Sequence, residues 1–156
     1  SEICIEDDIL KLCVVERHHN TGHIGVAFLK GYGLRSGAIA TSIAHDSHNI
    51  IVCGASDHDI ALAVNRLREI DGGMVIVQNG AVARELSLPI AGIMCSQNAE
   101  IVADALEELH DLAHKCGVPT NIDPFMTLSF AALPVIPTLK MTTLGVVDVE
   151  QFKLLS

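Results

Sequence analysis

Aromatic side chains are scarce in this sequence of 156 residues: they make up 3% of the chain, and tryptophan is absent. Proteins that bind single-stranded nucleic acid stack its bases on aromatic side chains, and this chain has few to offer. Basic residues are also few, at 10 against 19 acidic ones, which gives a formal net charge of −9. Because a nucleic-acid surface is basic, we expect no nucleic-acid partner.

Long hydrophobic runs are missing as well. No apolar stretch approaches the roughly 20 residues that a membrane-spanning helix requires, so we expect no membrane partner. The N-terminal segment Ser1–Asp8 is acidic and lacks the basic region of a signal peptide. The sequence also begins without methionine, from which we expect a processed, trimmed or partial chain.

Closely spaced cysteine pairs are absent. The cysteines are odd in number and widely spaced, at Cys4, Cys13, Cys53, Cys95 and Cys116. They lie in largely apolar stretches of the chain, where cysteine behaves as a small hydrophobic side chain. The pattern predicts neither a disulfide framework nor a cysteine zinc site, and it favours a reducing, cytoplasmic setting.

Aliphatic residues, in contrast, are abundant. Hydrophobic residues make up 49% of the chain, and the length is that of a single domain covering residues 1–156. This fraction is high for a soluble domain. It indicates that some apolar surface is covered by another domain or by a second copy, so we expect a homo-oligomer.

Short β-branched runs bounded by Gly, Asn and Ser predict strands and hairpins. The first two strands form a hairpin within Asp8–Leu34, with its turn at Arg17–Gly22. The further predicted strands are Ala38–Ala44, Asn49–Gly54, Met74–Val77, Ala81–Leu86 and a last one within Leu144–Phe152.

Apolar residues at helical spacing predict two main helices. One begins after the N-cap Ser56 and ends at Asp71–Gly73, and the other covers Asn98–Cys116. Prolines interrupt the next apolar stretch, which predicts a short helix or turn around Thr127–Ala132 and then an extended segment. The predicted fold is therefore α+β, with mixed or antiparallel sheets and two amphipathic helices packed on them.

The densest side-chain chemistry lies between two predicted strands, at His45, Asp46, Ser47 and His48. One hypothesis is a metal site made by the two histidines and Asp46, with help from Glu16 or His18 of the neighbouring hairpin. A second is a hydrolase with Ser47 as nucleophile, although neighbours this close rarely form a triad. The third is a polar loop whose side chains hydrogen-bond the backbone.

Two other polar groups also allow more than one interpretation. The cluster Glu16, Arg17 and His18 is either a set of substrate contacts or a solvated hairpin tip. His110 and His114 stand four residues apart on a predicted helix and could share a metal, but such pairs are more often surface residues. The acidic positions of that helix are typical of a solvated face.

Several segments closely resemble the C-terminal domain of bacterial-type adenine deaminase, a member of the amidohydrolase superfamily. The resemblance runs through Val14–Gly54, Ala63–Gly80, Leu88–Met94 and Pro124–Val149. The sequences HDSHNI and PFMTLSF within them are the most specific. The resemblance thus covers nearly the whole chain.

The resemblance implies a longer enzyme that hydrolyses adenine to hypoxanthine and ammonia in purine salvage. A (β/α)₈ barrel in its N-terminal part would hold manganese or iron, which generates the attacking hydroxide. Most metal ligands of the superfamily belong to the barrel, and its His-x-His motif does not match His45–His48. We therefore assign no catalytic residue, metal ligand or bound cofactor to this chain, and expect it to be inactive alone.

The resemblance also implies partners: the chain's own N-terminal barrel, and adenine as substrate of the whole enzyme. The candidates for positions near the substrate are His45, Asp46, Ser47, His48, Glu16, Arg17 and His18. These residues would close the barrel mouth or help to hold the purine. Two alternatives are a structural oligomerisation module and a stand-alone domain that binds a ligand without catalysis.

Overall fold

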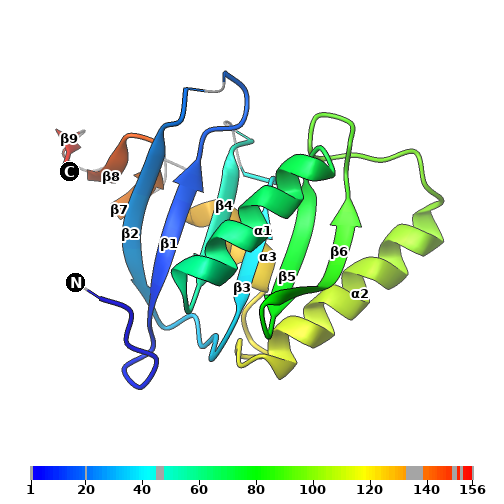
Figure 1. Ribbon diagram of the computed structural model, residues 1–156, viewed down its shortest axis with the longest axis horizontal. Helices are drawn as coiled ribbons and strands as arrows, with labels where there is room; N and C mark the ends of the chain where they lie inside the picture. Colours follow the sequence, from blue (N-terminus) through cyan, green and yellow to red (C-terminus); the bar gives the residue numbers. More distant parts are fainter. Residues whose placement is uncertain are drawn as a thin grey trace.

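The computed structural model describes residues 2–19, 21–44, 48–132, 139–148, 151 and 153–155. Its main sheet is antiparallel, with the strand order β2-β1-β4-β3-β5-β6 (Figure 1). These strands are β1 (Ile9–Val15), β2 (Ile24–Lys30), β3 (Ala38–Thr41), β4 (Ile50–Gly54), β5 (Gly73–Gln78) and β6 (Ala81–Ser87). With its helices, this sheet confirms the predicted α+β fold.

The N-terminal hairpin forms as predicted. β1 and β2 pair from Ile9 opposite Lys30 to Val15 opposite Ile24. β1 pairs on its other side with β4, so Val15 also lies opposite Ile50. β2 is consequently an edge strand of the main sheet. Strand β3 ends at Thr41, three residues earlier than the sequence predicted, because the backbone bends where Ala44 N–H donates to Ser42 O at 3.1 Å.

One face of the main sheet is covered by α1 (Asp57–Glu69), which lies over β3, β4, β5 and β6 (Figure 1). Ser56 caps this helix by accepting from Asp59 N–H at 3.2 Å, as predicted. Its buried side chains Ile60, Ala63, Val64 and Leu67 pack on Val52, Val75 and other strand residues. Burial of this apolar stripe holds the helix on the sheet.

The opposite face carries α2 (Ala99–Lys115), α3 (Pro124–Ala131) and a small second sheet. α2 packs on β5 and β6, α3 on β3 and β4, and the small sheet on β1 and β2. Leu109 of α2 and Leu128 of α3 are fully buried in this layer. Among the described residues, no helix combines the length and hydrophobicity that a membrane span requires.

The C-terminal part differs from the prediction in two ways. Helix α3 begins at Pro124, earlier than Thr127, because the Asp123 carboxylate accepts from Phe125 N–H and Met126 N–H. Proline suits this first helical turn, where its missing N–H has no partner to lose. The extended segment expected after this helix lies at 133–138, outside the described residues.

The strand predicted within Leu144–Phe152, at Gly145–Val149, is confirmed at Gly145–Asp148, but it is not the last strand, and its two neighbouring strands were not predicted. The segment forms a small antiparallel sheet of β7 (Leu139–Thr142), β8 (Gly145–Asp148) and β9 (Lys153–Leu154). Leu144 lies in the turn between the first two strands, where its N–H donates to Thr142 Oγ1 at 3.2 Å. The hairpin of β7 and β8 was not predicted, because an apolar residue occupies its turn in place of Asn or Asp.

Candidate functional site

Four connections meet at one end of the main sheet, at the top of Figure 1. They are residues 16–23 between β1 and β2, 42–49 between β3 and β4, 70–72 after α1, and 88–98 between β6 and α2. We call these residues the loop end. Residues 20 and 45–47 fall outside the part that the structure describes.

Arg17 links its own connection, between β1 and β2, to the other three. Its Nη1 donates to Asp71 O at 3.0 Å and its Nη2 to Ala91 O at 2.7 Å. Its backbone N–H donates to Asn49 Oδ1 at 3.4 Å. The predicted proximity of the first hairpin turn to the β3–β4 connection is therefore confirmed.

The cradle around the Arg17 guanidinium depends on two glycines. A Cβ added at Gly72 would lie 2.7 Å from Arg17 Nη1, and one at Gly92 would lie 2.5 Å from it. Both glycines have positive φ, +101° and +74°, which glycine adopts at little cost. The sequence therefore needs glycine at both places for the guanidinium to reach the carbonyl groups.

Ser42 fixes the beginning of the β3–β4 connection. Its side chain is fully buried, accepts from Gly73 N–H at 2.7 Å and donates to Gly92 O at 2.6 Å. Ser129 of α3 donates to Ile43 O. This contact joins the PFMTLSF segment to the β3–β4 connection, two residues before the HDSHNI segment begins. Helix α3 thus supports the connection from beneath.

Glu16 stabilises the first hairpin turn. Its carboxylate accepts from the backbone N–H groups of His19 and Thr21, the latter at 3.1 Å. These hydrogen bonds, that from His19 foremost, lower the pKa of Glu16 from its usual value. The Glu16 carboxylate is therefore held as an anion that organises the turn.

His48 is the part of the HDSH sequence that the structure describes. It adopts a left-handed backbone conformation with φ of 46°, and its N–H donates to Ala44 O at 2.9 Å. His48 Nδ1 and Arg17 Nε are buried and have no hydrogen-bond partner among the described residues. Because a buried unpaired polar atom costs about 1–3 kcal/mol, both nitrogens are candidates for contacts from outside the domain.

The metal-site hypothesis and the Ser47 hydrolase hypothesis both depend on His45, Asp46 or Ser47. These three residues lie outside the described part of the chain, so both hypotheses stay predictions. Among the residues that are described, no group of three or more His, Cys, Asp and Glu side chains is arranged to hold a metal ion.

A pocket of about 450 Å³ opens at the loop end. It is lined by Glu16, Arg17, His18, Leu67, Arg68 and Asp71. All three residues of the predicted cluster Glu16–His18 therefore line one cavity. The sequence did not point to Arg68 and Ser42, since one lies on a helix and the other in an apolar strand run. The neighbouring glycines Gly72 and Gly73 were the one available signal of a close backbone approach.

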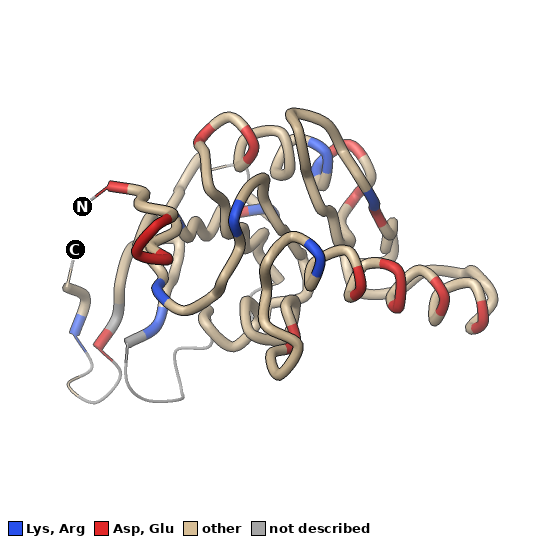
Figure 2. The backbone as a smooth tube through the Cα atoms, turned by 90° about the horizontal axis from the view of Figure 1, so that it is seen from below, with Lys and Arg blue, Asp and Glu red and all other residues tan. Residues whose placement is uncertain are grey.

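The histidines of α2 have other partners. His110 Nε2 lies 3.1 Å from Asp123 Oδ2, and His114 Nδ1 lies 2.9 Å from Val118 O. Figure 2 shows acidic residues along α2, in agreement with the predicted solvated face. One of them, Glu108, pairs with Arg84 at 2.5 Å. This helix therefore offers ion pairs and a helix cap rather than a converging ligand set.

Comparison with known proteins identifies the family of this chain. The family described as the adenine deaminase C-terminal domain matches residues 2–153. The chain belongs to this family. It is 52% identical to adenine deaminase of Bacillus subtilis (strain 168) over 151 residues, 97% of this chain and 26% of that protein.

Two further relatives agree. Adenine deaminase 2 of Carboxydothermus hydrogenoformans is 52% identical over 147 residues, 94% of this chain and 26% of that protein. Adenine deaminase of Brucella abortus (strain 2308) is 50% identical over 149 residues, 96% of this chain and 26% of that protein. The chain thus spans about a quarter of the length of these relatives and matches their C-terminal part.

Proposed function

We propose that this domain serves an adenine deaminase, with its loop end facing the mouth of a metal-containing barrel formed by the N-terminal part of the same polypeptide. The observation that carries this proposal is the loop end itself. Four connections are fastened together there, around a pocket lined by charged side chains of both signs and two buried nitrogens without partners among the described residues. Such a rigid, polar end is suited to position side chains over a neighbouring site.

The proposed reaction is hydrolysis of adenine to hypoxanthine and ammonia, as part of purine salvage in the cytoplasm. Manganese or iron in the barrel would supply the metal-bound hydroxide that this chemistry needs. In this domain, Arg17 and Ser42 act as positioning residues that hold the β3–β4 connection. His48 offers Nδ1 to the purine or to the barrel, and closure of the site would exclude water from it.

A second candidate role is that of a structural and oligomerisation module. Exposed apolar side chains favour it, among them Ile24, Ile101 and Phe130, which are 55%, 57% and 42% exposed. Such side chains mark surfaces that contact other proteins when they are contiguous. If the domain has this role, replacing these side chains should disrupt the oligomer. The activity of each site that still assembles should stay unchanged.

The two roles are distinguished by His48→Ala in the longer polypeptide that carries this domain. We expect kcat/KM for adenine to fall about ten-fold or more, because misplaced groups at a reacting site are costly, while the melting temperature and oligomeric state stay unchanged. His58→Ala is the matched control, since His58 lies on α1 with a side chain 77% exposed. If His48→Ala were as active as the control, the proposal that the loop end lies at the active site would be wrong.

A further inference from the structure

A second surface of this domain is apolar and uncovered. On the face of the sheet that α1 covers, the helix lies over β3–β6, and the outer strand β2 extends beyond it (Figure 1). Ile24 and Val26 of β2 are 55% and 48% exposed there. Their cross-strand partners, Val15 and Cys13 of β1, belong to the core beneath α1.

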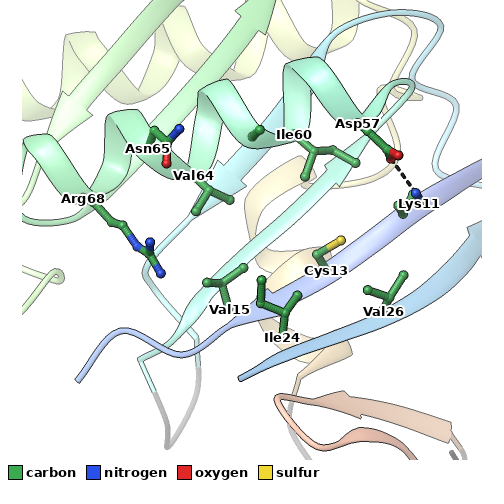
Figure 3. Close-up of a pocket in the computed structure, with 11 residues that line it drawn as sticks. Lys11, Cys13, Val15, Ile24, Val26, Asp57, Ile60, Val64, Asn65 and Arg68 are labelled. Atoms are coloured by element: carbon green, nitrogen blue, oxygen red, sulfur yellow. Dashed lines mark hydrogen bonds and ion pairs between the residues drawn. The ribbon is translucent and has the colours of Figure 1, made fainter. Parts of the chain in front are cut away.

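These side chains form the floor of a groove of about 330 Å³ between β2 and α1, which we call the β2 groove (Figure 3). Its lining residues are Lys11, Cys13, Val15, Ile24, Val26, Asp57, Ile60, Ala61, Val64, Asn65 and Arg68. The ion pair of Lys11 with Asp57 stands at one end of the groove, and Arg68 stands at the other (Figure 3).

Charge and position indicate what the β2 groove binds. Arg68 is exposed, and its guanidinium has no hydrogen bond or ion pair with another described residue, in a chain whose net charge is −9. An apolar floor that ends at an unpaired guanidinium complements an apolar segment that ends in a carboxylate. Arg68 also lines the pocket of the loop end, so a segment in the groove would reach that pocket.

We propose that the β2 groove is the docking surface for the N-terminal part of the longer deaminase polypeptide, which inserts an apolar segment and pairs a carboxylate with Arg68. The relatives have about three quarters of their length outside the region that this chain matches, since it covers 26% of each. The N-terminus of the domain lies on the β1–β2 side of the molecule, away from α2 (Figure 1). An isolated antiparallel β-bridge between the backbones of Cys4 and Ile9 holds the N-terminal segment beside the start of β1.

Hydroxyl-radical footprinting with mass spectrometry tests this docking. The oxidation rates of Ile24 and Val26 are compared between this 156-residue chain and the longer polypeptide. We expect the rates to fall about ten-fold in the longer polypeptide, because the core of an interface excludes water. Ile101 on α2, 57% exposed, is the internal control and should keep its rate.

Two variants of the longer polypeptide sharpen the test. Val26→Asp should restore oxidation of Ile24, and Arg68→Glu should do so partly, whereas Ile101→Asp should leave Ile24 protected. Equal oxidation of the groove in both polypeptides would overturn the proposal. Concentration-dependent protection in the 156-residue chain, with twice its mass in solution, would also overturn it in favour of a second copy.

The proposal rests on the proposed function only in assuming a longer polypeptide. Footprinting measures coverage and not deamination, so the two can fail separately. A protected groove in a polypeptide that does not deaminate adenine would leave docking intact and remove the proposed activity. An unprotected groove in an active enzyme would do the opposite.

Discussion

At the scale of single residues, the loop end depends on small side chains that let a large one approach the backbone. The Arg17 guanidinium lies against Gly72 and Gly92 and donates to the carbonyls of Asp71 and Ala91. Asp71 and Ala91 themselves have positive φ, 59° and 56°. Such conformations are costly outside glycine and persist here because the arginine bonds to both carbonyls.

Gly92→Ala tests the close approach. Alanine in this left-handed backbone conformation destabilises the fold by about 1 kcal/mol. The new Cβ would also lie 2.5 Å from Arg17 Nη1, and such overpacking adds about 1–3 kcal/mol of destabilisation. Gly31→Ala is the matched control, since Gly31 has φ of +90° with no atom within 4 Å of an added Cβ. Urea unfolding should show the larger loss for Gly92→Ala, and equal losses would contradict the cradle.

At the scale of elements, helix α3 is organised by its N-cap. Asp123 accepts from two backbone N–H groups of the first turn and lies 3.1 Å from His110 Nε2. Partial burial raises the pKa of Asp123, but the hydrogen bonds from Met126 N–H, His110 and Phe125 N–H outweigh it and lower the pKa overall. The cap therefore works through the ionised carboxylate.

Asp123→Asn should flatten the pH dependence of stability at acid pH. A lowered pKa in the folded state adds stability above the unfolded value, about 3.9, and that stability is lost as pH falls through the folded value. The wild type should thus lose more free energy of unfolding between pH 6 and pH 3 than the variant, by only about 0.5 kcal/mol because solvent screens a side chain that is 48% exposed. Asp104→Asn on the exposed face of α2 is the control. Parallel pH profiles for wild type and Asp123→Asn would refute the role of the charge.

At the scale of the whole molecule, the domain brings distant parts of the chain to one end and leaves an apolar surface along one side. Ser42 contacts residues 31 and 50 positions further on, Gly73 and Gly92. Both cysteines of the sheet core, Cys13 and Cys53, are free and buried, and burial raises the pKa of each thiol. The domain is thus fastened by packing and hydrogen bonds, and all five of its cysteines are free.

Removal of metal tests the remaining hypothesis for the HDSH segment. We expect a chelator to leave the melting temperature of the 156-residue chain unchanged, because the described residues contain no group arranged to hold a metal. Metal content measured by mass spectrometry is the companion experiment. A lower melting temperature with stoichiometric metal would mean that His45, Asp46 and His48 form a site, since metal binding to the folded state alone stabilises it.

The sequence by itself determined the local elements. Ser56 caps the first main helix as expected, the second lies within the predicted Asn98–Cys116, and the Asn79-Gly80 turn joins β5 to β6. These features depend on neighbours in the chain, through caps, turn residues and apolar spacing. In the small C-terminal sheet, the strand at Gly145–Asp148 was expected, but its pairing with β7 escaped prediction because the turn at Leu144 lacks such a signal.

Only the tertiary structure decided which elements adjoin. The order β2-β1-β4-β3-β5-β6 brings Arg17, Asn49, Asp71 and Ala91 together, although they are spread over more than seventy positions, as the contact between residues 17 and 91 shows. The same order leaves β2 at an edge and opens the groove beside α1. No local pattern encodes such proximity, because it follows from strand register and from how each helix packs on the finished sheet.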